Sequence, residues 1–160
     1  MPQQLANIQV TVADLRRPEE LQAAAALFDA YRQFYGQPSD VVAASNFLRQ
    51  RGELGQSVLL LARDASGHAV GLCQNYPSFS SVSMAPIWVL NDLFVSQAAR
   101  RCGAARALLA AAADTARRAG AIRLTLCTQQ QNHRAQALYE SLGWLRDSEF
   151  FTYHLRLPSS

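Results

Sequence analysis

Residues 89–109, VLNDLFVSQAARRCGAARALL, constrain the fold more than any other stretch of this chain. They begin as an apolar strand, turn at residues 96–99, and continue as a helix rich in alanine and leucine. Backbone N–H groups at such a helix start, together with the helix dipole, form an anion site. Gly103 allows close approach to the backbone, and Arg100 and Arg101 add charged donors. The stretch therefore predicts an anion site, with a buried helix that merely starts in arginines as the alternative.

The turn does not match the common nucleotide-binding loops. A P-loop requires a lysine after its second glycine, and all fifteen basic residues of this chain are arginines. The dinucleotide fingerprint requires three glycines after an early strand, whereas this turn contains only Gly103. The lack of lysine also excludes Schiff-base chemistry.

Composition favours one globular domain over residues 1–160. Hydrophobic residues make up 49% of the chain and charged residues 17%, which argues against disorder. The net charge of +3 favours anionic ligands, but the scattered arginines give no support for nucleic-acid binding. We expect no membrane span and no metal site, because apolar runs are short and the three cysteines lack metal-ligand spacing. A reducing cytoplasm is the expected location.

Periodicity and turn residues predict the elements along the chain. Consecutive strands joined by short loops indicate an antiparallel meander, and the strand after the 102–119 helix is expected to run parallel to strand 87–95. The predicted strands are 8–12, 57–63, 68–74, 87–95, 122–128 and two within 144–157. The predicted helices are 14–34, 40–51 with Ser39 as its cap, 102–119 and 132–142, and 76–81 is a predicted loop.

A second informative stretch is NHRAQALY, residues 132–139. Asn132, Ala135 or Gln136, and Tyr139 share one helix face, so an amide, a small residue and a phenol lie in a row. A long, thin ligand could lie along this face with the phenol at its reactive end. The alternative is a half-buried helix whose tyrosine is satisfied within the protein.

Together the two stretches resemble the GNAT superfamily of N-acetyltransferases. The family pattern Arg/Gln-x-x-Gly-x-Gly/Ala, and then Asn-x-x-Ala-x-x-x-Tyr with a later Gly-aromatic pair, is matched by Arg100, Gly103, Ala105, Asn132, Ala135, Tyr139, Gly143 and Trp144. The resemblance implies a single-domain α/β fold. Its mixed, mostly antiparallel sheet would have about seven strands flanked by four helices.

The resemblance also implies acetyl-CoA as co-substrate and assigns residues to it. Backbone amides of residues 102–106 would hold the pyrophosphate, an amide near Val95 would face the thioester oxygen, and Tyr139 would act as general acid at the sulfur. The residues expected to bind acetyl-CoA are Leu93, Phe94, Val95, Arg100, Arg101, Cys102, Gly103, Ala104, Ala105, Arg106, Asn132 and Ala135.

The general base is less clear from the residues. Many relatives have a glutamate where this chain has Asn91, which cannot accept a proton, so the role passes to Asp92, to an ordered water or to His133. Asn91 and Asp92 point to opposite faces of a regular strand. The acceptor pocket is expected between the first helices and residues 76–84. Its expected substrate-binding residues are Tyr31, Tyr35, Tyr76 and Asn91.

We therefore expect an N-acetyltransferase that moves acetyl from acetyl-CoA to a primary amine of a small molecule by direct attack. The scarcity of carboxylates in the first half disfavours polyamines. Two alternatives are an acyl-CoA-binding regulatory module without turnover and a protein or peptide N-acetyltransferase. A homodimer formed through the final strands is a further expectation that the sequence does not fix.

Overall fold

The computed structural model describes residues 7–159 and divides the chain into two compact units, one up to Cys127 and one from Thr128 onward. The single domain expected for residues 1–160 stays a prediction. The first unit holds β1 (Gln9–Val12), α1 (Pro18–Phe34), α2 (Val41–Glu53), β2 (Val58–Arg63), β3 (Ala69–Ser80), β4 (Ala85–Val95), a short 3₁₀ turn η1 (Gln97–Ala99), α3 (Ala104–Arg118) and β5 (Leu124–Thr125). The second unit holds α4 (His133–Ser141).

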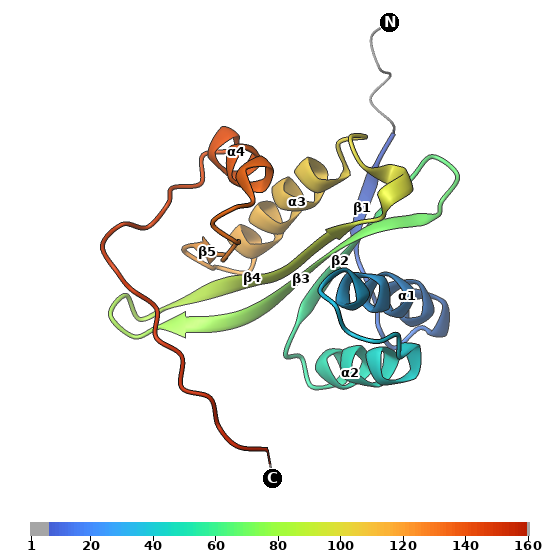
Figure 1. Ribbon diagram of the computed structural model, residues 1–160, viewed down its shortest axis with the longest axis horizontal. Helices are drawn as coiled ribbons and strands as arrows, with labels where there is room; N and C mark the ends of the chain where they lie inside the picture. The colour runs from blue at the N-terminus through green and yellow to red at the C-terminus, as the bar shows by residue number, and fades with distance from the viewer. Residues whose placement is uncertain (1–6, 160) are drawn as a thin grey trace, which may run out of the picture. The chain divides into compact units, whose positions relative to one another are not determined.

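The strands of the first unit form one sheet in the order β1-β2-β3-β4-β5 (Figure 1). Pairs β2–β3 and β3–β4 are antiparallel and β4–β5 is parallel, as the sequence predicted, and β1 adds a further antiparallel pair with β2. Helix α3 makes the crossover between the two parallel strands. The sheet is therefore an antiparallel meander of β1 to β4, to which β5 adds one parallel strand.

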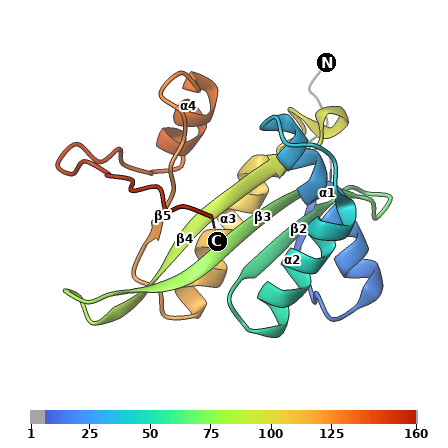
Figure 2. The same cartoon turned by 60° about the horizontal axis from the view of Figure 1, so that its bottom comes forward.

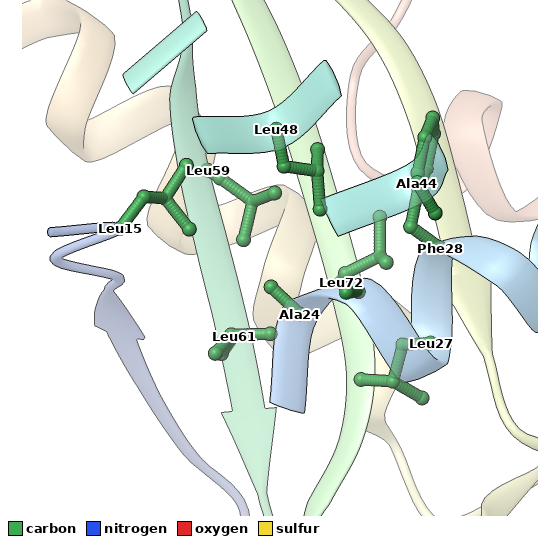
Figure 3. Close-up of a cluster of buried hydrophobic side chains, with 10 residues drawn as sticks. Leu15, Ala24, Leu27, Phe28, Ala44, Leu48, Leu59, Leu61 and Leu72 are labelled. Atoms are coloured by element: carbon green, nitrogen blue, oxygen red, sulfur yellow. The ribbon is translucent and has the colours of Figure 1, made fainter. Parts of the chain in front are cut away.

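Helices cover both faces of this sheet. Figures 1 and 2 show α1 and α2 on one face and α3 on the other. β2 is buried on both faces because Leu59 and Leu61 face the first pair of helices while Leu60 points the other way, which explains its continuous apolar run. The largest buried cluster lies between α1, α2 and the sheet (Figure 3). Among the described residues, no helix combines the length and the apolar character needed to cross a membrane.

β3 and β4 form a longer hairpin than expected, and the predicted loop at residues 76–81 is wrong. Cross-strand pairing continues from Tyr76–Val89 to Ser80–Ala85, so Tyr76 lies in β3 and not in a loop. β2 begins at Val58, opposite Asn75, so β3 has no partner on that side beyond this point. An edge of this kind tolerates Pro77, which lacks an N–H group.

The sheet has five strands where about seven were expected. The predicted strand 122–128 shrinks to Leu124–Thr125, and the two strands predicted in 144–157 are absent from the described residues. The alternating side chains of this tail lie exposed, Phe151 and Tyr153 at 90% each. Alternation alone indicated strands, but a strand needs a hydrogen-bonded partner, and residues 128–159 of the second unit contain no sheet.

Asp29 in α1 joins the end of this helix to the start of α2. Its carboxylate accepts hydrogen bonds from Ser39 Oγ at 2.7 Å, from the Asp40 backbone N–H at 2.8 Å and from Gln33 Nε2 at 3.1 Å. The expected cap residue of α2, Ser39, is thus used by Asp29. Asp40 caps the helix instead and accepts from Ala43 N.

These bonds make the stability of the first unit depend on pH. The hydrogen bonds from Ser39 and Asp40 hold the pKa of Asp29 below its usual value of 3.8. A lowered folded-state pKa stabilises the fold above the unfolded-state pKa, and this contribution is lost as pH falls through the folded-state pKa. We expect Asp29→Asn to unfold at lower urea than the wild type at pH 7, and the two urea midpoints to converge as pH falls toward 2. A midpoint difference that stays constant with pH would contradict this role.

Candidate active site

The turn between β4 and α3 has the backbone shape of an anion site. Gly103 precedes the helix with φ +84°, Arg101 has φ +65°, and no side chain caps the helix. The first intrahelical bond runs from Ala107 N to Gly103 O at 3.0 Å. The N–H groups of the preceding turn therefore lie outside the helical ladder and are presented at its start.

The side chains of this turn take different places. Arg100, Arg101 and Arg106 are all exposed, and the guanidinium of Arg100 lies 5.6 Å from the ring centre of Phe34 in α1. The thiol of the half-buried Cys102 donates to the carbonyl of Ala99. Ala104 is buried and Ala105 half-buried. The turn thus offers backbone N–H groups with exposed arginines beside them.

The end of β4 lies next to this turn and is paired on one side. β4 pairs with β5 only at Trp88 and Val89, whereas Leu93, Phe94 and Val95 pair with β3 alone in the described ladder. Because Gly71 in β3 has no side chain, Leu108 of α3 can pack close to the sheet beside the end of β4. A Cβ at this position would lie 3.0 Å from Phe94 O and 3.1 Å from Leu108 Cδ1.

A β-bulge in β4 decides which way Asp92 points. Gln74 lies opposite Asp92, and Asn75 lies opposite Leu90, so Asn91 is an extra residue without a partner in β3. Gln74 and Asn75 are consecutive and point to opposite faces, and residues opposite one another share a face. Asp92 therefore faces α1, away from Leu90, although regular alternation would place these two side chains together.

Asp92 is a buried carboxylate, 5% exposed, that accepts hydrogen bonds from two side chains. Gln74 Nε2 donates to its Oδ2 at 2.9 Å and Asn91 Nδ2 donates to its Oδ1 at 3.0 Å, and the phenol of Tyr31 in α1 lies close enough for the carboxylate to add to the effect of burial in raising its pKa. The acids that form ion pairs in the described part of the chain are Asp14, Glu19, Glu20, Glu53, Asp64 and Asp114. Asp92 is not among them.

Aromatic side chains surround this carboxylate. Burial, followed by the negative charge of Asp92, raises the pKa of both Tyr31 and Tyr76, so both phenols remain O–H donors at neutral pH. Tyr35 packs edge-on against Tyr31 at 5.1 Å between ring centres, and Phe94 does so at 6.0 Å. The structure thus places Tyr31 and Tyr76 at Asp92, with Tyr35 behind Tyr31 and 53% exposed.

Gln74 is a site residue that the sequence interpretation missed. It is fully buried, and its Nε2 contacts Tyr76 Oη at 3.0 Å as well as Asp92. The available signal was a pair of amides, Gln74 and Asn75, that interrupts an otherwise apolar strand. Without knowledge of the bulge, nothing in the sequence placed Gln74 beside Asp92.

The second unit holds the other predicted residues, and it is described by itself. Asn132 caps α4 by accepting from Ala135 N at 3.2 Å, so its Oδ1 is used within the helix and its amide nitrogen remains available. Tyr139 is half-buried, and its ring centre lies 6.0 Å from that of Trp144. The described residues contain no cluster of three or more His, Cys, Asp or Glu side chains that could hold a metal.

Comparison with known proteins gives the family. A family model described as the acetyltransferase (GNAT) family matches residues 22–144, which include most of α1, the bulge, the turn and α4. The chain belongs to the acetyltransferase (GNAT) family. Membership makes it an acyltransferase and confirms both the resemblance and the fold class predicted from the sequence.

Individual GNAT relatives support this. The chain is 47% identical over 137 residues to the uncharacterized N-acetyltransferase YhfO of Bacillus subtilis (strain 168), a match that covers 86% of this chain and 91% of that protein. It is 38% identical to a solved structure of a probable acetyltransferase, with a TM-score of 0.86 and coverage of 95% and 99%. An aminoglycoside acetyltransferase from a soil metagenomic sample, 21% identical with a TM-score of 0.73 and coverage of 96% and 99%, shares the fold.

The turn geometry allows a test of whether Gly103 belongs to a phosphate site for CoA, as the sequence predicts. Gly103→Ala introduces a Cβ at φ +84°, and the resulting backbone strain should displace the first-turn N–H groups and raise the Kd for CoA about tenfold. Gly67→Ala is the matched control, because Gly67 also has φ +84° but lies in the β2–β3 turn. Both variants should lose similar stability in thermal unfolding. Calorimetric titration with CoA should separate them, and equal affinities would contradict a phosphate site at Gly103.

Proposed function

We propose that this GNAT protein transfers acetyl from acetyl-CoA to a primary amine of a small molecule by direct attack. The observation that supports this best is the environment of Asp92, a buried carboxylate without an ion-pair partner among the described residues. A buried anion favours a cationic or proton-donating ligand, and the surrounding rings add attraction for an ammonium group. An acceptor that carries an amine satisfies both requirements.

The β4–α3 turn suits the diphosphate of CoA. The left-handed backbone at Gly103, the first-turn N–H groups of α3 and the exposed Arg101 and Arg106 would hold the phosphates. The one-sided pairing of Leu93–Val95 suits the amide-bearing pantetheine arm. The family resemblance, and not the geometry, assigns Asn132 to the same arm. When bound, acetyl-CoA supplies an acetyl group activated as a thioester.

Three groups of the protein divide the remaining work. Asp92 accepts the proton that the amine loses as its nitrogen bonds to the acetyl carbon. A backbone N–H near Val95 donates to the thioester oxygen, where negative charge develops. Tyr139 donates a hydrogen bond toward the departing sulfur. Full proton transfer from a phenol to a thiolate is uphill by about 2 kcal/mol at ordinary pKa values, so hydrogen-bond donation is the role assigned to Tyr139.

The arrangement favours turnover over a regulatory module that only binds acyl-CoA. Binding of CoA alone requires no buried carboxylate beside phenols. Asn91, which cannot act as a base, instead donates to Asp92 Oδ1. Asn91 stands where many relatives have a glutamate, and here its amide hydrogen-bonds the carboxylate of Asp92, which takes the role of base.

An amine panel with acetyl-CoA, read by mass spectrometry, tests this function. The panel contains 2-phenylethylamine, putrescine, lysine, glucosamine, kanamycin and a short peptide. Asp92→Asn should lower kcat/KM for the accepted amine by about 10²–10⁴-fold, as expected for loss of a general base, and Tyr139→Phe by about tenfold. Neither should change CoA affinity by more than about twofold.

The matched control is Asp114→Asn, which alters an exposed acid that pairs with Arg117 and Arg118 on α3. Its activity should equal that of the wild type. Full activity in Asp92→Asn would remove Asp92 from the chemistry. CoA binding without any acetylated product would favour the regulatory alternative, and a peptide product alone would redirect the substrate class.

A further inference from the structure

Gln74 occupies an unusual position for an amide side chain. It lies in the middle of β3, is 0% exposed, and directs its amide nitrogen at two oxygen atoms, Asp92 Oδ2 at 2.9 Å and Tyr76 Oη at 3.0 Å. The two N–H bonds of a primary amide are thereby both used. Gln74 joins the carboxylate on β4 to the phenol on its own strand.

The other end of the same amide has no partner. Gln74 Oε1 is buried and makes no hydrogen bond in the described structure. A buried acceptor without a donor destabilises the fold, because no hydrogen bond compensates for its loss of water. Rotating the amide by half a turn would place this oxygen against the Asp92 carboxylate, where two acceptors repel. Asp92 therefore sets the orientation of the Gln74 amide, and in this orientation Gln74 Oε1 has no hydrogen-bond donor.

Two donors to Asp92 differ in their surroundings. Asn91 reaches Oδ1 from an exposed position, where water can replace it, whereas Gln74 reaches Oδ2 from the interior, where no water competes. We infer that Gln74 is the positioning residue that fixes the orientation of Asp92 toward the acceptor amine. This inference rests on the proposed function, since it acts through the carboxylate assigned as the base.

A double-mutant cycle tests the inference. Gln74→Met keeps the length of the side chain and removes the donor, and it should lower kcat for the panel amine turned over fastest by about tenfold, with KM for acetyl-CoA unchanged. Because Gln74 acts through Asp92, adding Gln74→Met to Asp92→Asn should cause no further loss. Tyr76→Phe is the matched control. This variant removes the other oxygen to which the Gln74 amide donates but leaves the bond to Asp92. Its kcat should therefore fall by less than about threefold, compared with about tenfold for Gln74→Met.

The outcomes separate this inference from the function on which it rests. Multiplicative losses in the double variant, or an unchanged kcat in Gln74→Met, would overturn the positioning role while leaving the transferase function intact. Full activity in Asp92→Asn, by contrast, would overturn the function. Thermal unfolding identifies a variant that does not fold, and in that case Gln74→Asn, which is too short to reach Asp92, replaces it.

A crystal structure of Gln74→Met gives a readout that does not depend on turnover. If Gln74 holds the carboxylate, Asp92 should adopt a different or a second side-chain conformation in the variant. An Asp92 that keeps its single orientation would overturn the inference even if no panel amine is accepted.

Discussion

One extra residue in β4, Asn91, decides which side of the sheet carries a charge. In a regular strand Asp92 would share the face of Leu90, which packs toward α3. The bulge turns Asp92 toward α1, where burial and its charge raise the pKa of Tyr31 and where Gln74 lies directly opposite. Without the bulge, the carboxylate would enter an apolar layer that contains Leu108 and Leu109, and the α1 face would carry no acid on β4.

β4 connects two sites with different electrostatic requirements. Its middle carries a carboxylate among phenols, which suits an amine, and its end leads into a turn of N–H groups and arginines, which suits an anion. The close approach at Gly71 packs Leu108 of α3 against the end of β4, so the turn proposed to bind the anion is fixed to the strand that bears Asp92. A cationic acceptor and an anionic donor can therefore be held on one strand, at positions that do not repel either ligand.

The sequence was sufficient for the elements whose local signals and partners agree. The strand–turn–helix at the end of β4 and the parallel β4–β5 pair were predicted because glycine, arginine and apolar residues occur at the spacing that this geometry needs. The tail was mispredicted because Phe151, Tyr153 and Leu155 alternate like strand residues, and alternation says nothing about a pairing partner. The sequence predicted only part of the site at Asp92. Its carboxylate and tyrosines were named from the sequence, but a bulge depends on cross-strand register, which a single strand does not encode.

Neighbouring amides in β3 show how a polar pair in a strand can serve two purposes. Asn75 faces the α3 side, donates to the carbonyl of Val58 at 3.2 Å and exchanges contacts with the thiol of Cys73, so its polar atoms are used where β2 begins. Gln74 faces the other side and leaves its carbonyl oxygen without a partner. Asn75 serves the strand pairing itself, whereas the amide of Gln74 donates only to Asp92 and Tyr76 and carries an unsatisfied acceptor that a leucine or methionine would not have. The difference between these adjacent side chains is what distinguishes a residue that stabilises the sheet from one that is held in place for the carboxylate beside it.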